Sequence, residues 1–202
     1  MDSGVIISLF DSIPLWVMIL PILICSVIAI AVIIERSIFF KKINYDYRLI
    51  LANNLRLVEE KKIDEARALN RRYSGPIVGM IEVVMDRLES ENIRERIIME
   101  SSEEAIRIIE KYIGTISTVA TISPMLGLLG TVTGMMKSFS GLSKIGQAAH
   151  DLLAYGIAEA LITTAMGLLV AIPSLIFYNY MVSRVDYYIK EVEYVANTLS
   201  EI

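Results

Sequence analysis

The segment Tyr112–Met136 has the sequence YIGTISTVATISPMLGLLGTVTGMM, which contains no Asp, Glu, Lys or Arg in 25 residues. Two other segments share this property, Ser12–Ile34 with 23 residues and Ala160–Ser183 with 24. A helix needs about 20 apolar residues to cross a bilayer core that is ~30 Å thick. The sequence therefore predicts an all-α membrane protein with three transmembrane helices, at residues 12–34, 112–136 and 160–183.

The charged residues define the other segments. No Lys or Arg precedes the first span, whereas Arg36, Lys41 and Lys42 follow it directly, and basic residues mark the cytoplasmic side of a span. The acidic flank before the first span is unlike the basic start of a cleaved signal peptide, so we expect a retained anchor. We predict an outer, periplasmic N-terminus and a cytoplasmic C-terminus, with an outer N-terminal segment at 1–11, a cytoplasmic helical domain at 35–111, an outer loop at 137–159 and a cytoplasmic C-terminal helix at 184–202.

The cytoplasmic segments are predicted to be helical. Residues 44–61, 62–72 and 77–88 have helix-forming compositions separated by short breaks, the clearest of which is Gly75-Pro76. Asn92 is a candidate N-cap, and no helix breaker follows it before Pro124, so one helix over 92–137 is expected. The third span should continue in the same way, because apolar residues recur at spacings of three and four beyond it, at Val185, Tyr188, Val192, Val195, Leu199 and Ile202.

Composition argues against several classes of function. The chain has one cysteine, Cys25, and one histidine, His150, and it lacks the phosphate-loop, nucleophile-elbow and zinc-protease motifs. Its net charge is −4, with both signs interleaved, which does not suit a nucleic-acid surface. We therefore expect no enzyme activity, no cofactor, no metal site and no nucleic-acid partner.

Small and hydroxyl residues recur at spacings of three and four in the second and third spans. One interpretation is close helix packing, because small residues let backbones approach in lipid. The other is that these faces line a shared pore, and both can hold together. The residues singled out for packing or a helix kink are Pro124, Gly127, Gly130, Gly134, Gly167 and Pro173.

Glu159 is a carboxylate directly before the third span. Ionisable groups near hydrocarbon are costly and are therefore candidates for function. The alternative is an interfacial acid that reaches water and favours the N-terminal end of a helix dipole. None of the three spans contains an acid, so this chain by itself offers no proton relay across the membrane.

Two segments carry a resemblance to a known family. They are Ile122–Phe139 (ISPMLGLLGTVTGMMKSF) and Gly156–Asn179 (GIAEALITTAMGLLVAIPSLIFYN), and together they resemble the signature of the MotA/TolQ/ExbB proton-channel family. The three spans, the large inner loop and Ser74-Gly75-Pro76 within that loop are also similar to this family. Length and span number are more similar to its ExbB-type members than to its MotA-type members, with the TolQ type a close second.

The resemblance implies a function and a set of partners. It implies a homo-oligomer, a pentamer, in a bacterial inner membrane around a single-span ExbD- or TolR-like protein with a transmembrane Asp. Proton flow would then energise a TonB- or TolA-like protein. By position, Glu159 matches the acid at the head of the third span, Thr131 and Thr164 match pore-facing hydroxyls with Thr163 beside them, and Pro124 and Gly127 match a break in the second span.

Two hypotheses about function remain open. The first is a proton-channel subunit, and the second is a passive oligomeric scaffold that positions its partners. Glu159 and the hydroxyl-lined faces favour the first, since a scaffold does not require them. Residues 159 and 164, however, are about 140° apart around an ideal helix, so they do not face one point squarely.

Overall fold

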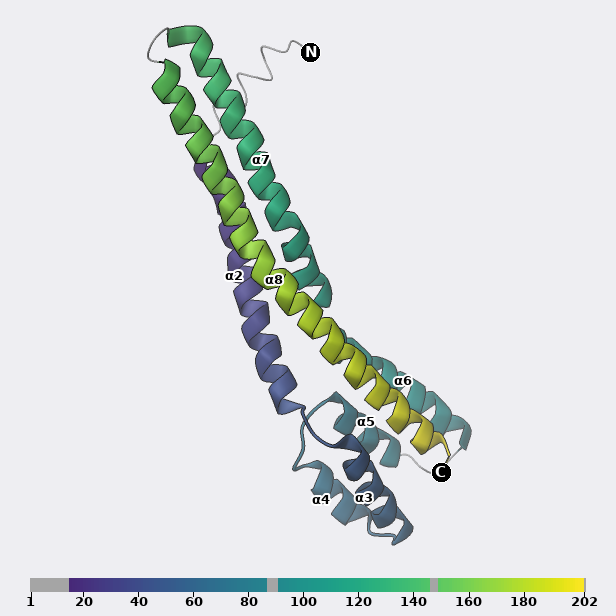
Figure 1. The fold of residues 1–202 in the computed structure, drawn as a ribbon. Helices are drawn as coiled ribbons and strands as arrows, with labels where there is room; N and C mark the ends of the chain where they lie inside the picture. The colour runs from purple at the N-terminus through teal and green to yellow at the C-terminus, as the bar shows by residue number, and fades with distance from the viewer. Residues whose placement is uncertain (1–14, 87–90, 146–148, 202) are drawn as a thin grey trace. The chain divides into compact units, whose positions relative to one another are not determined.

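The structure is a computed structural model that describes residues 15–86, 91–145 and 149–201. The described residues form helices and contain no strand (Figure 1). The all-α prediction is therefore confirmed for these residues. In chain order the helices are α2 (Leu15–Lys42), α3 (Tyr47–Glu59), α4 (Ile63–Asn70), α5 (Pro76–Met85), α6 (Glu91–Glu110), α7 (Ile113–Ile145) and α8 (Ala149–Ser200).

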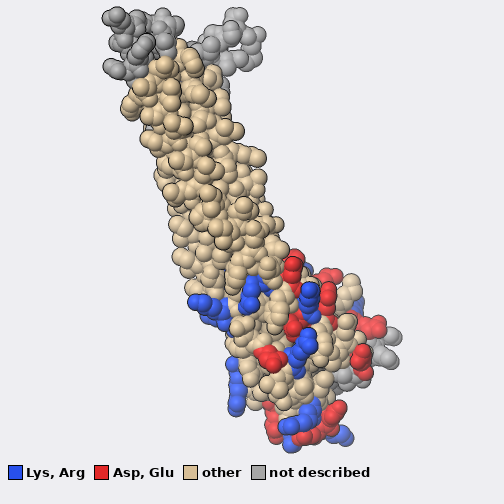
Figure 2. Space-filling view, in the orientation of Figure 1, with Lys and Arg blue, Asp and Glu red and all other residues tan. Residues whose placement is uncertain are grey.

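Three stretches are long and apolar enough to cross a membrane, namely Trp16–Lys42, Arg94–Phe139 and Leu153–Ser200. At most 28% of the most apolar window of each is buried within the chain, so large apolar side chains are left exposed. In the view of Figure 2, the charged side chains gather over one part of the molecule, and a long part shows none. This distribution fits three membrane spans, and their exact limits in the bilayer stay a prediction.

Contacts divide the chain into two compact units. Unit 1 comprises Met1–Ile33 and Gly114–Asn179, and unit 2 comprises Ile34–Ile113 and Tyr180–Ile202. Unit 1 therefore holds most of α2 and α7 and the first part of α8. Unit 2 holds α3 to α6 with the last part of α8.

The short helices of unit 2 are close to the predicted ones. The carboxylate of Asp46 accepts a hydrogen bond from the Leu49 N–H and caps the start of α3. Asn54 and Asn70 are buried and hydrogen-bonded at 2.8 Å, which pins α3 to α4. Gly75 has φ 144°, a conformation that favours glycine, and a Cβ there would lie 3.0 Å from Cγ2 of Ile43. Gly75 therefore lets the chain turn tightly into α5.

Helix α8 confirms the predicted continuation of the third span. It is one helix of 52 residues, and the apolar stripe beyond Ser183 is buried from Val185 to Leu199. In the part of α8 that belongs to unit 1, the buried residues also recur at spacings of three and four, but they are small rather than large and apolar. They are Gly156, Ala160, Thr163, Gly167, Ala171 and Ser174.

The prediction of one helix over 92–137 is wrong. Helix α6 ends at Glu110, α7 begins at Ile113, and between them Tyr112 has a left-handed φ of 69°. The predicted N-cap, Asn92, lies inside α6, which begins one residue earlier. No glycine or proline occupies the two residues of the break.

Arg36 of α2 binds the chain at this break. It is 1% exposed, and its guanidinium donates to the carbonyl oxygens of Ile108, at 3.3 Å, and Ile109. Its guanidinium carbon also lies 4.1 Å from the ring centroid of Phe39. A positive charge is stabilised at the C-terminal end of a helix, where carbonyl groups lack partners. Arg36 thus donates hydrogen bonds to carbonyl groups in the last turn of α6, directly before the helix is interrupted.

We predict that Arg36→Gln loosens this break. The shorter neutral side chain leaves buried carbonyls without donors, at a cost of about 2 kcal/mol. Amide hydrogen exchange of residues 109–114, followed by mass spectrometry, should become faster, and Arg36→Lys should give an intermediate rate. Arg56→Gln, on an exposed residue of α3, is the matched control. Unchanged exchange in Arg36→Gln would show that another contact holds the break.

Candidate functional site

The candidate glycines lie where α7 and α8 approach each other in unit 1 (Figure 1). Glycines of α7 lie against α8. A Cβ added at Gly127 would lie 3.0 Å from Cα of Thr164. One added at Gly130 would lie 2.6 Å from Cβ of Thr163, and one added at Gly134 would lie 2.9 Å from Cβ of Ala160. From α8, a Cβ at Gly167 would lie 2.5 Å from the Ser123 carbonyl oxygen. The two backbones are therefore so close that only glycine fits at these positions without a shift.

The three threonine hydroxyls donate to backbone carbonyls. Thr164 bonds across the helix pair to Gly127 O at 2.9 Å. Thr163 is fully buried and bonds to Ala160 O, and Thr131 is half-buried and bonds to Leu128 O, both at 2.7 Å within their own helices. A hydroxyl in this state can still accept a hydrogen bond from water. These groups can orient water, but each must rotate before it passes on a proton.

Glu159 is half-buried on α8. Gly156, Ala160 and Thr163 around it on the same helix are buried. Its carboxylate makes no ion pair or hydrogen bond with another residue of the described chain. The structure brings Thr163 and Thr164 together on the α7–α8 contact and does not join Glu159 or Thr131 to them.

The two prolines lie within helices. Helix α7 continues through Pro124, so the break expected at Pro124 and Gly127 is absent there, and the break before this span is at Lys111–Tyr112 instead. A helix tolerates a proline in a membrane when neighbouring groups satisfy the freed carbonyl. Pro173 lies within α8 on an exposed position.

Two further residues of this contact were not predicted as packing residues. A Cβ at Gly156 would collide with the Ser138 side chain, and Ser123 is buried, with its hydroxyl bonded to its own helix and its carbonyl oxygen against Gly167. Gly156 lies in the motif Gly156–Asn179, and its small size could have indicated a packing position. Ser123 lies one residue before Pro124, which the sequence analysis named instead.

The described residues include no group of three or more His, Cys, Asp or Glu side chains placed to hold a metal ion. What the described chain presents is a helical membrane protein with three candidate spans, two of which pack through glycine and threonine.

Comparison with known proteins identifies the family. A family model described as the MotA/TolQ/ExbB proton channel family matches residues 50–194, which include α7 and most of α8. The chain belongs to the MotA/TolQ/ExbB proton-channel family. This is a family of channel and transport subunits and not a family of enzymes.

Individual relatives of this chain are ExbB-type and TolQ-type proteins. The chain is 33% identical to the ExbB-like 3 protein of Synechocystis sp. over 79% of this chain and 77% of that protein. It is 29% identical to the biopolymer transport protein ExbB of Salmonella typhimurium over 83% of this chain and 72% of that protein. The Tol-Pal system protein TolQ of Haemophilus influenzae is 47% identical over 40% of this chain and 36% of its own length. The chain is therefore ExbB-like, with TolQ similar over a shorter region.

Proposed function

We propose that this protein is the proton-channel subunit of an inner-membrane complex that converts a proton gradient into work. The observation that carries the proposal is the family match over residues 50–194, combined with a carboxylate, Glu159, at the start of an uncharged helix segment. The chain would form a homo-oligomer, a pentamer, with its N-terminus in the periplasm and its C-terminus in the cytoplasm.

The partner would be a single-span protein with a transmembrane aspartate. None of the three uncharged segments of this chain contains an acid, so a proton carrier must come from a second polypeptide. An ExbD-like partner with a TonB-like protein is favoured, because the ExbB relatives align over about four-fifths of the chain. A TolR-like partner in a Tol system is the alternative, since the TolQ relative has the higher local identity.

A passive scaffold is the second candidate function. One observation favours it, namely that the hydroxyls of Thr131, Thr163 and Thr164 are all bonded to backbone carbonyls. A scaffold would use these residues for helix packing alone and would not need a carboxylate at position 159.

Assembly can be tested by purifying the tagged full chain from membranes of its native host and measuring the mass of the intact complex. We expect five copies of this chain with one or two copies of a single-span protein that has an Asp in its span. The identity of that protein distinguishes the ExbB-type from the TolQ-type system. An oligomer of this chain alone, recovered under mild conditions, would argue for the scaffold.

A further inference from the structure

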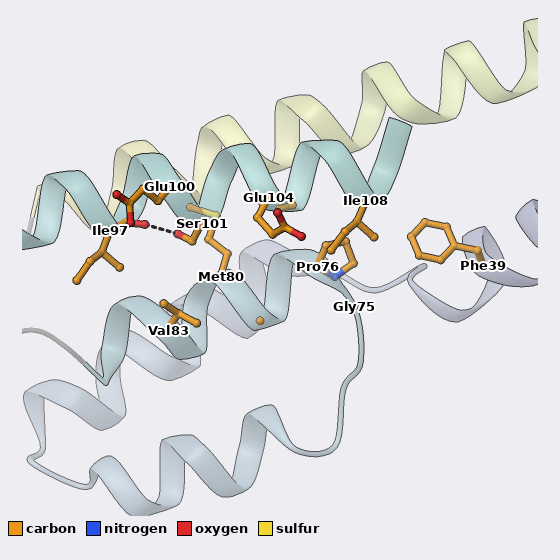
Figure 3. A pocket seen from close by; sticks show the side chains of 12 residues that line it. Phe39, Gly75, Pro76, Met80, Val83, Ile97, Glu100, Ser101, Glu104 and Ile108 are labelled. Atoms are coloured by element: carbon orange, nitrogen blue, oxygen red, sulfur yellow. Dashed lines mark hydrogen bonds between the residues drawn. The ribbon is translucent and has the colours of Figure 1, made fainter. Parts of the chain in front are cut away.

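Unit 2 contains an open groove of about 620 Å³ between α5 and α6. Figure 3 shows side chains of both helices facing it, Met80 and Val83 from α5 and Ile97 and Ile108 from α6. Val83 is 43% exposed and Ile108 is 37% exposed, although they belong to the charge-rich unit. Met80 and Ile97 are only 2% and 7% exposed and form the floor of the groove, so Val83 and Ile108 are the apolar side chains of this group that the described part of the chain leaves uncovered.

Gly79 lies in the lining of the groove and inside α5. A Cβ at this position would meet no atom within 4 Å, so packing within the chain does not require glycine there. Glycine inside a helix costs about 1 kcal/mol relative to alanine. An absent side chain at Gly79 instead lets a second backbone approach α5 closely.

The groove is acidic on its α6 side. Glu100 and Glu104 are exposed residues one helical turn apart, and no Lys or Arg is among the described residues that line the groove. Their ion-pair partners, Arg96 at 2.8 Å from Glu100 and Arg107 at 3.3 Å from Glu104, are exposed neighbours on the same helix. Such surface ion pairs contribute little and can exchange for another base.

We infer that this groove binds a basic amphipathic helix of a partner protein. An apolar face would cover Val83 and Ile108, a small residue would lie against Gly79, and Lys or Arg beside that face would pair with Glu100 and Glu104. Ile97 and Ile108 are eleven residues apart, so the groove follows α6 for ~16 Å and fits about three turns of a bound helix. This binding does not depend on proton transport.

The test uses the full chain in phosphatidylcholine nanodiscs, which avoids attraction of a basic peptide to anionic lipid. The probe is a fluorescent helical peptide of about three turns, with Leu and Ala on one face and Lys on both flanks of it. A second peptide has Glu in place of every Lys. We expect saturable binding of the basic peptide at low salt, roughly tenfold weaker binding in 0.5 M salt, and no binding of the acidic peptide.

Variants locate the binding. Glu100→Gln with Glu104→Gln should weaken binding roughly tenfold, whereas Glu95→Gln with Glu103→Gln removes the same charge from exposed positions of α6 outside the groove and should leave it unchanged. Gly79→Leu should fill the groove and abolish saturable binding. Val83→Lys should weaken binding by charge repulsion if Gly79→Leu impairs folding.

Several results would overturn the inference. Equal binding of the basic and acidic peptides would remove charge complementarity, and unchanged affinity in Gly79→Leu and Val83→Lys would place the peptide elsewhere. Absence of saturable binding to the native chain would reject the site. A smaller oligomer mass in Gly79→Leu would show that a second copy of this chain occupies the groove.

Discussion

Glu159→Ala is expected to reduce partner-dependent proton flux to the level of liposomes that lack the partner, while the oligomer still assembles. Glu159 is half-buried, and its carboxylate has no ion pair within the described chain. A carboxylate at the edge of hydrocarbon is costly, and packing alone would use Ala or Gln there at less cost. A negative charge at the mouth of a pore also concentrates cations before they reach the partner's aspartate.

Glu159→Gln separates the charge from the shape of this side chain. If the charge is needed, Gln should lower the flux as strongly as Ala does. Glu193→Ala, at an exposed position of the same helix, is the matched control and should leave flux unchanged. Flux equal to that of the native chain in Glu159→Ala, with the partner's aspartate still required, would remove Glu159 from the proton pathway.

Gly167→Leu is expected to separate α7 from α8 and prevent recovery of a folded oligomer. A Cβ at Gly167 would lie 2.5 Å from the carbonyl oxygen of Ser123 and 3.1 Å from Cα of Gly127. Both are backbone atoms of α7, so they cannot move aside as a flexible side chain can. Overpacking costs about 1–3 kcal/mol for added methylene groups and more when backbones must shift, so Gly167→Ala should already be destabilising.

Gly114→Leu is the matched control for this substitution. Gly114 is also helical and in α7, but a Cβ there would meet no atom within 4 Å. Size-exclusion chromatography in mild detergent, with a thermal unfolding scan, should show native behaviour for Gly114→Leu and loss of the folded peak for Gly167→Leu. Equal stability of the two variants would contradict the close α7–α8 contact.

The periodic features of this fold could be predicted from the sequence. The α8 stripe from Val185 to Leu199 is an example, because one continuous helix must bury the same face along its length. The three candidate spans follow in the same way from apolar length. Such features depend on local composition and spacing alone.

The sequence did not determine which face of α7 packs against α8. Pro124 and Thr131 fit a spacing of three and four as well as Ser123 and Gly130 do, because small residues are frequent on both faces of this helix. Gly130 is among the residues predicted to pack, but only the structure shows that Ser123 makes the contact on the same face, with its carbonyl oxygen against Gly167. The break at Lys111–Tyr112 could not be predicted either, because no glycine or proline marks it and the side chain that binds the carbonyls before it, Arg36, lies more than 70 residues earlier in the chain.

The most direct test of the proposed function is proton flux into liposomes that contain this chain alone, this chain with its single-span partner, or this chain with a partner whose transmembrane Asp is replaced by Asn. The three uncharged segments offer no acid to carry a proton, so we expect flux only with the native partner. Equal flux with and without the partner, or no flux from the complete complex under a proton gradient, would contradict the assignment of this chain as a proton-channel subunit.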